Sequence, residues 1–207
     1  SVVATAGNAT ASVAFVAPAS TGGSLITGYT VTSSPGGITA MGTTSPINVT
    51  GLTNGTAYTF TVVATNGVGN SVASAASAAV TPATVPGAPT SVVATAGNTT
   101  ASVAFVAPAS TGGSLITGYT VTSSPGGITA MGTTSPINVT GLTNGTAYTF
   151  TVVATNGVGN SVASAASAAV TPATVPGAPT SVVATAGNTT ASVAFVAPSS
   201  TGGSVIT

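Results

Sequence analysis

The feature that most constrains this chain is an internal repeat of ninety residues. Residues 1–90 match residues 91–180 at every position but one, and residues 181–207 begin a third copy. A period of this length exceeds most solenoid units but fits a small all-β domain. The repeat therefore predicts independent domains in tandem, each of them one copy.

The most informative stretch within a copy is GLTNGTAYTFTVVATNGVGNS, residues 141–161, which also stands at 51–71. Every second residue in its centre is apolar: Tyr148, Phe150, Val152 and Ala154. This alternation indicates a strand with one buried face. Asn144-Gly145 before the strand and Asn156-Gly157 after it predict tight turns with positive φ.

Further short strands, separated by turn residues, are expected along the second copy at 91–95, 101–107, 116–123, 128–131 and 137–142. The residues expected to face inward are Val92, Ala94, Val103, Phe105, Tyr119 and Val121. A last strand, rich in Ala and Ser, should end at Val170. About seven strands without a helical period predict a β-sandwich.

Four segments carry a family resemblance: PGAP at 86–89, SVAFVAP at 102–108, ITGYTV at 116–121, and Leu142 followed six residues later by Tyr148. Together they resemble the fibronectin type III domain, of the kind repeated in bacterial surface or extracellular proteins. The resemblance implies an all-β fold of tandem, immunoglobulin-like, seven-stranded sandwiches. It also implies a tyrosine corner at Tyr148, whose hydroxyl would bond to nearby backbone.

The chain departs from that family in two ways. Phe105 stands where the family usually has Trp, which implies a smaller core. Charged residues are absent, so no Arg-Gly-Asp segment exists and the family's integrin-binding role cannot apply.

Proline-rich joints place the expected boundaries at 1–84, 85–174 and 175–207. The first domain lacks its proline-rich leading segment, and the last holds two strands and part of a third. Such a fragment cannot bury a core alone. We expect a window on a longer repetitive polymer, with completion by a strand from another subunit as the alternative.

Composition excludes most reaction chemistry. The chain has no Lys, Arg, Asp, Glu, His or Cys. General acid–base catalysis, metal binding and phosphate or nucleic-acid binding all depend on these side chains. We therefore expect no enzyme activity, no catalytic, cofactor-binding or metal site, no cofactor and no nucleic-acid partner. No apolar run is long enough to span a membrane, and the start at Ser1 indicates a mature or excised segment.

The remaining polar features have structural interpretations. Tyr29 and Tyr119 are expected in the core, and Gly22-Gly23 and Gly36-Gly37 in turns, because no Lys accompanies these glycines at a phosphate site. Asn-x-Thr triplets begin at Asn8, Asn48, Asn54, Asn98, Asn138, Asn144 and Asn188. They are formal glycosylation acceptors, although Asn also suits turns. Glycans on these Asn or on exposed Ser and Thr are one way to hydrate an uncharged surface.

The missing charge favours contacts with copies of the same chain, because charged residues are depleted at the cores of interfaces. Identical patches at a fixed spacing can propagate into a filament. The first hypothesis is thus a self-assembling extracellular or cell-surface filament, sheath or fibre. The alternative is a passive spacer in a large surface adhesin or secreted enzyme. A carbohydrate-binding module is a third hypothesis, weakened because most aromatic residues have core assignments.

Overall fold

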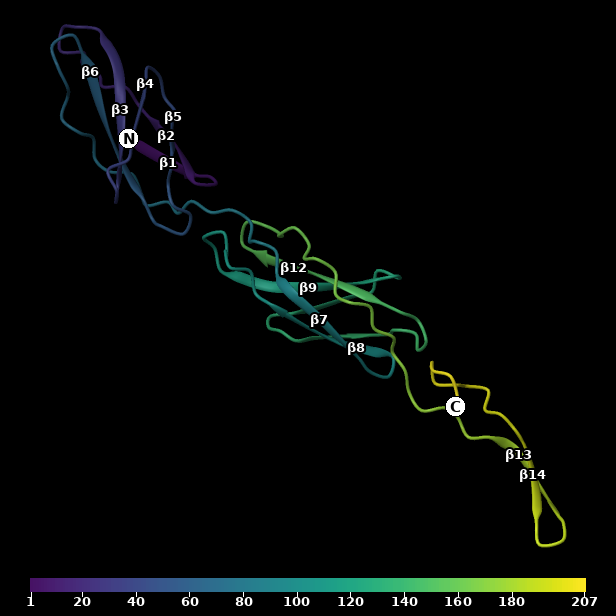
Figure 1. Cartoon of the computed structure of the whole chain (residues 1–207). Coiled ribbons are helices and arrows are strands. Elements are labelled where there is room, and N and C mark those ends of the chain that lie inside the picture. Colours follow the sequence, from purple (N-terminus) through teal and green to yellow (C-terminus); the bar gives the residue numbers. More distant parts are fainter. The chain divides into compact units, whose positions relative to one another are not determined.

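The computed structural model describes residues 1–207, and its regular elements are all β-strands (Figure 1). Antiparallel pairing organises them into three-stranded sheets and one hairpin. By their contacts the residues divide into two compact units. The first comprises Ser1–Gly87, Ala109–Thr117 and Thr155–Ser161, and the second comprises Ala88–Pro108, Gly118–Ala154 and Val162–Thr207.

The first copy contains two sheets of three strands each. One sheet has the order β1-β2-β5 and the other the order β4-β3-β6. The strands are β1 (Val2–Ala6), β2 (Thr10–Phe15), β3 (Ile26–Ser34), β4 (Thr39–Gly42), β5 (Ile47–Thr50) and β6 (Thr59–Asn66). The apolar faces of both sheets contribute to one core cluster, in which Phe60, Val13, Val31 and Val49 are fully buried. The β-sandwich expected from the pattern is therefore present.

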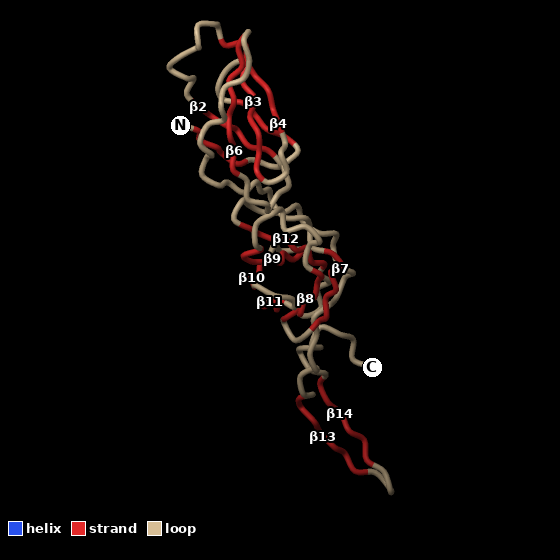
Figure 2. Tube along the Cα trace, turned by 90° about the vertical axis from the view of Figure 1, so that its left-hand side faces the viewer, coloured by secondary structure: helices blue, strands red, loops and turns tan.

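The second copy repeats this topology, with sheets β11-β8-β7 and β10-β9-β12 (Figure 2). Its strands are β7 (Thr90–Ala96), β8 (Thr100–Val106), β9 (Ile116–Ser124), β10 (Thr129–Gly132), β11 (Ile137–Thr140) and β12 (Thr149–Asn156). Alternate residues of β12 are buried, from Phe150 to Asn156. Val103, Phe105, Tyr119 and Val121 all face inward as predicted.

Phe105 occupies the core position at which the resemblance leads us to expect Trp. Its ring lies 4.8 Å from that of Tyr119, at an interplanar angle of 53°. Such a tilted pair is a favourable aromatic arrangement. The smaller Phe ring thus packs against Tyr119, which confirms the core assignment of this tyrosine.

The prediction of a regular last strand ending at Val170 is wrong. Between Ser161 and Val170 only an isolated bridge from Val170 to Tyr148 is formed. The segment from Ser161 to Val170 forms backbone hydrogen bonds with β12 at every third of its residues, whereas a regular strand would do so at every second one. Ser164 and Ser167 donate their backbone amides to the carbonyls of Val152 and Phe150, each at 2.9 Å.

Serine hydroxyls complete this pairing. The amide of Val152 donates to Ser164 Oγ (2.9 Å) and that of Phe150 to Ser167 Oγ (3.1 Å). Each hydroxyl therefore accepts a bond that a backbone carbonyl would accept in a regular ladder. We call Ser161, Ser164 and Ser167, with Ser71, Ser74 and Ser77 in the first copy, the serine ladder.

The turn expected at Asn156-Gly157 is also wrong in detail. Asn156 is the last residue of β12 and is buried, and Gly157 has no positive φ. Asn156 Oδ1 accepts instead from the amides of Val158 (2.8 Å) and Gly159 (3.1 Å). At the other Asn-Gly pair, Gly145 has a φ of 83°, as predicted.

The third copy forms one hairpin, β13 (Thr180–Ala186) with β14 (Ala191–Val196). Every residue of both strands is exposed, and Phe195 is 61% exposed. The hairpin has no second sheet to pack against, as expected for a fragment of this length. The boundaries at 84/85 and 174/175 stay predictions.

Candidate functional site

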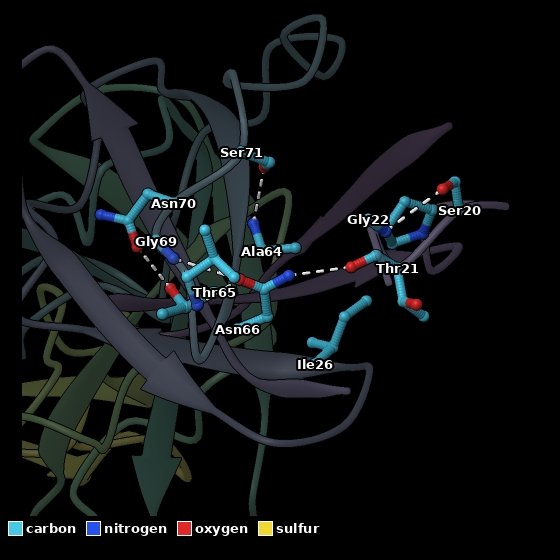
Figure 3. Close-up of a pocket in the computed structure, with 12 residues that line it drawn as sticks. Ser20, Thr21, Gly22, Ile26, Ala64, Thr65, Asn66, Gly69, Asn70 and Ser71 are labelled. Carbon is cyan, nitrogen blue, oxygen red and sulfur yellow. Dashed lines mark hydrogen bonds between the residues drawn. The ribbon is translucent and has the colours of Figure 1, made fainter. Parts of the chain in front are cut away.

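A hollow in the first compact unit lies beside the end of β6 and has a volume of about 480 Å³ (Figure 3). Loop residues Ser20, Thr21 and Gly22 form one side. Asn66 and Gly69 form another. Ser110, Thr111 and Gly112 in the loop before β9, together with Asn156, are their counterparts in the second copy.

Asn66 organises this hollow through both ends of its side-chain amide. Its Nδ2 donates to the Thr21 carbonyl at 2.8 Å. Its Oδ1 accepts from the amides of Val68 (2.9 Å) and Gly69 (3.1 Å). One side chain therefore joins the 20–22 loop to the loop after β6. The role of Asn66 was not predicted, since Asn reads as a turn residue and its partner lies 45 positions away.

The lining offers amides, hydroxyls and backbone groups but no side chain that gains or loses a proton near neutral pH. Such a surface can bind a neutral polar ligand or polypeptide backbone through hydrogen bonds. It offers no general acid, general base or metal ligand. The absence of catalytic, cofactor and metal sites stays a prediction for the whole chain.

The predicted tyrosine corner is present in both copies. The amide of Thr143 donates to the Tyr148 hydroxyl at 3.1 Å, and that of Thr53 to the Tyr58 hydroxyl at the same distance. Both tyrosines are 5% exposed. These phenols are therefore structural groups that hold the start of the strand to the loop before it.

The fibronectin type III domain model matches residues 1–80 and 87–170, which is most of the chain. The chain belongs to the fibronectin type III family. Its tyrosine corners and the core position of Phe105 follow that family's pattern as the resemblance implied.

Three bacterial enzymes contain segments similar to these fibronectin type III repeats. Chitinase A1 of Niallia circulans is 43% identical over 70% of the chain. Endoglucanase B and Exoglucanase B of Cellulomonas fimi are 36% and 37% identical over 76% and 72% of it. The chain spans only 21%, 16% and 14% of the lengths of these three relatives.

The Asn-x-Thr triplets of the fibronectin type III repeats occupy two kinds of position. Asn54 lies in a local network, since its Oδ1 accepts from the Ala9 amide and its Nδ2 donates to Asn8 Oδ1, both at 2.8 Å. Asn144 and Asn98 repeat the side-chain bond at 2.8 Å. Asn48, by contrast, points outward from β5. The network gives Asn54 and Asn144 a structural role without any glycan.

Removing one corner hydroxyl should destabilise one repeat. In Tyr148→Phe the Thr143 amide loses its acceptor, so the free energy of unfolding of the second repeat should fall by about 1–3 kcal/mol. Urea denaturation followed by tyrosine fluorescence would measure the loss. Tyr119→Phe is the matched control, because it removes the hydroxyl of another buried tyrosine and leaves the bond between Thr143 and Tyr148 intact. Equal stabilities of the two variants would contradict the assigned role.

Stability should be flat across neutral pH and rise in alkali. The Thr143 amide, donating to the Tyr148 hydroxyl, lowers the pKa of that tyrosine from 10.0, and Thr53 does the same to Tyr58. A pKa lower in the folded than in the unfolded chain stabilises the fold as pH rises through the folded value. The free energy of unfolding should thus be constant from about pH 5 to 8 and increase towards about pH 10.

The measurement is a series of urea titrations across that pH range. The double variant Tyr58→Phe/Tyr148→Phe should lose the alkaline rise, because it removes both phenols whose pKa is lowered by a loop amide. A fall in stability towards pH 10, or a bell-shaped profile centred near neutrality, would refute this prediction.

Proposed function

We propose that these repeats are a spacer inside a secreted polysaccharide-degrading enzyme. The observation that carries the proposal is the similarity to Chitinase A1, at 43% identity over 70% of the chain but only 21% of the relative. Endoglucanase B and Exoglucanase B are likewise matched over only 16% and 14% of their lengths. The matched segments are thus a minor part of large enzymes.

The physical character of the repeats supports this role. Each complete copy is a packed sandwich in which buried polar side-chain atoms all have hydrogen-bond partners. Without charged side chains, its stability should depend little on pH between about 5 and 8, or on salt up to about 0.15 M. Catalysis and substrate binding would then belong to other domains of the same protein.

The proposed location is extracellular, because polysaccharides such as chitin are too large to enter a cell. No helix capable of crossing a membrane occurs in the structure. The filament expected first from the sequence finds no parallel among these relatives. Self-association and glycans on Asn, Ser or Thr likewise rest on the sequence alone.

The test is to replace the matched segment of Chitinase A1 with this chain and to compare it with a deletion of that segment. The spacer hypothesis expects hydrolysis of solid chitin to be retained in the replacement and reduced in the deletion. Hydrolysis of a soluble chitin oligosaccharide should be unchanged in both. A deletion that hydrolyses solid chitin at the full rate would overturn the proposal.

Two measurements on the chain itself complete the test. The spacer hypothesis expects it to sediment as a monomer and to remain in solution when mixed with chitin or cellulose powder. Filaments in the electron microscope would instead support the self-assembling fibre. Retention on the powders would support a carbohydrate-binding module.

A further inference from the structure

The loop at Ser20–Gly22, which forms one side of the hollow, has counterparts at 110–112 and 200–202, and both bind a backbone segment. In the first compact unit, the backbone of Thr84–Gly87 lies on the second copy's loop. The Thr84 amide donates to the Gly112 carbonyl at 2.8 Å, and the Gly87 amide to the Ser110 carbonyl at 2.9 Å. Asn156 Nδ2 donates to the Thr84 carbonyl at 2.8 Å. The segment is thus held through its backbone.

The same contact recurs in the second compact unit. The Thr174 amide donates to the Gly202 carbonyl at 2.7 Å, and the Gly177 amide to the Ser200 carbonyl at 2.9 Å. The occupying sequence is again Thr-Val-Pro-Gly. Two separate instances of one geometry indicate a binding site built into the repeat.

Burial shows the effect of the occupant on identical sequences. Asn156 is 4% exposed, whereas Asn66 is half-buried. Gly112 is buried, whereas Gly22 is exposed. Asn156 Nδ2 donates to two carbonyls, those of Thr84 and Thr111, while Asn66 Nδ2 donates to Thr21 alone. In the first copy, one N–H of the Asn66 side-chain amide is therefore left without the partner that Asn156 finds in the Thr84 carbonyl.

Glycine is required where the occupant passes closest. A Cβ built on Gly112 would overlap the Thr84 carbonyl oxygen and lie 2.6 Å from that of Val85. A Cβ on Gly22 would meet nothing closer than Asn66 Nδ2 at 3.7 Å. Both glycines have positive φ, 73° and 68°. The space above Gly22 thus matches the space that the Thr84 backbone fills above Gly112.

A second, smaller hollow of about 280 Å³ extends the first, sharing Pro18, Ala64 and Ser71 with it. It also exposes part of Phe15 and Tyr29. Their counterparts Phe105 and Tyr119 are buried. In the second copy, Pro86 and Pro89 of the leading segment are buried as well.

We propose that the hollow at Gly22 and Asn66 is a docking site for an extended Thr-Val-Pro-Gly segment joined directly ahead of Ser1. The segment is recognised by hydrogen bonds to its first and fourth residues, as Thr84 and Gly87 are on the second copy's loop. Because site and segment both lack charge, binding depends on backbone geometry and shape. This inference is independent of the proposed spacer function.

The experiment adds PATVPGAPT, the sequence of residues 82–90, ahead of Ser1 and follows the side-chain amides of Asn66 and Asn156 by NMR. In the chain as it stands, the two amides should give separate signals. In the extended chain, the Asn66 signals should move onto those of Asn156. Hydrogen exchange at the added Thr amide should be slower by about tenfold than in a scrambled extension, as for one net hydrogen bond.

Two glycine variants of the extended chain make the test specific. Gly22→Ala should return the Asn66 signals to their original positions. Gly51→Ala is the matched control, since Gly51 has a φ of 77° and open space around its Cβ position. This control should leave the Asn66 signals on those of Asn156.

Four outcomes would overturn the proposal. Three are unchanged Asn66 signals in the extended chain, the same movement with the scrambled extension, and insensitivity to Gly22→Ala. Signal movement that depends on protein concentration, with a dimer in sedimentation, would assign the occupant to a second copy and refute docking within one chain.

Discussion

Phe150→Ala is expected to destabilise the second repeat by about 3–5 kcal/mol, the largest effect of any single substitution considered. The Phe150 ring is fully buried on β12, next to Val152 and 6.4 Å from the Tyr148 ring. Truncation removes the transfer free energy of the ring and leaves a cavity that the surrounding sheets fill only partly. For a domain stable by about 5–15 kcal/mol, the loss is a large share.

The near-identical first repeat provides an internal reference. Urea denaturation of Phe150→Ala should show two transitions, one at the original midpoint and one at a lower urea concentration. Phe195→Ala is the matched control, because Phe195 is 61% exposed and should change stability by less than about 0.5 kcal/mol. A single transition shifted as a whole would mean that the repeats unfold together, which contradicts their treatment as independent domains.

The sequence predicts the strands and core of this fold well because each residue there obeys a local rule. The period of two in Tyr148, Phe150 and Val152 needs no partner to be interpreted, since one buried face explains it. The tyrosine corner was predictable from the spacing of Leu142 and Tyr148 and from the family resemblance. Leu142 is 3% exposed in the structure.

The candidate site was far less predictable, since it depends on contacts between distant residues. Asn156 reads as half of an Asn-Gly turn, yet it ends β12 and bonds the backbone of Thr84, 72 positions earlier. Gly112 reads as a flexible loop residue, yet its missing side chain leaves room for that backbone. Neither role is visible until the loop and the leading segment are placed together.

The prediction of a last strand was wrong because the sequence of that segment has a period of three. Ser161, Ser164 and Ser167 stand three apart, which matches neither alternation nor a helix. An Ala/Ser-rich run between turns and a final Val suggested a strand by its composition. The period of three is explained only by the neighbouring strand β12, whose amides and carbonyls form hydrogen bonds with these serines.

Removing a buried hydroxyl from the serine ladder is also expected to destabilise the second repeat. In Ser167→Ala the buried Phe150 amide loses its acceptor at 3.1 Å, and no water can reach it because Phe150 is fully buried. A buried donor without a partner costs about 1–3 kcal/mol. The backbone bond from Ser167 N to Phe150 O should remain, so the repeat should fold with reduced stability.

The matched control moves the hydroxyl by one residue without changing composition. In Ser167→Ala/Ala168→Ser the new serine is placed at an exposed position, where its hydroxyl points away from the Phe150 amide. Both variants should lose the same free energy of unfolding and show faster hydrogen exchange at the Phe150 amide. Recovery of full stability in the double variant would show that the position of the hydroxyl does not matter. In that case, the period of three would be a feature of composition, and the serines would not replace the carbonyls of a seventh strand.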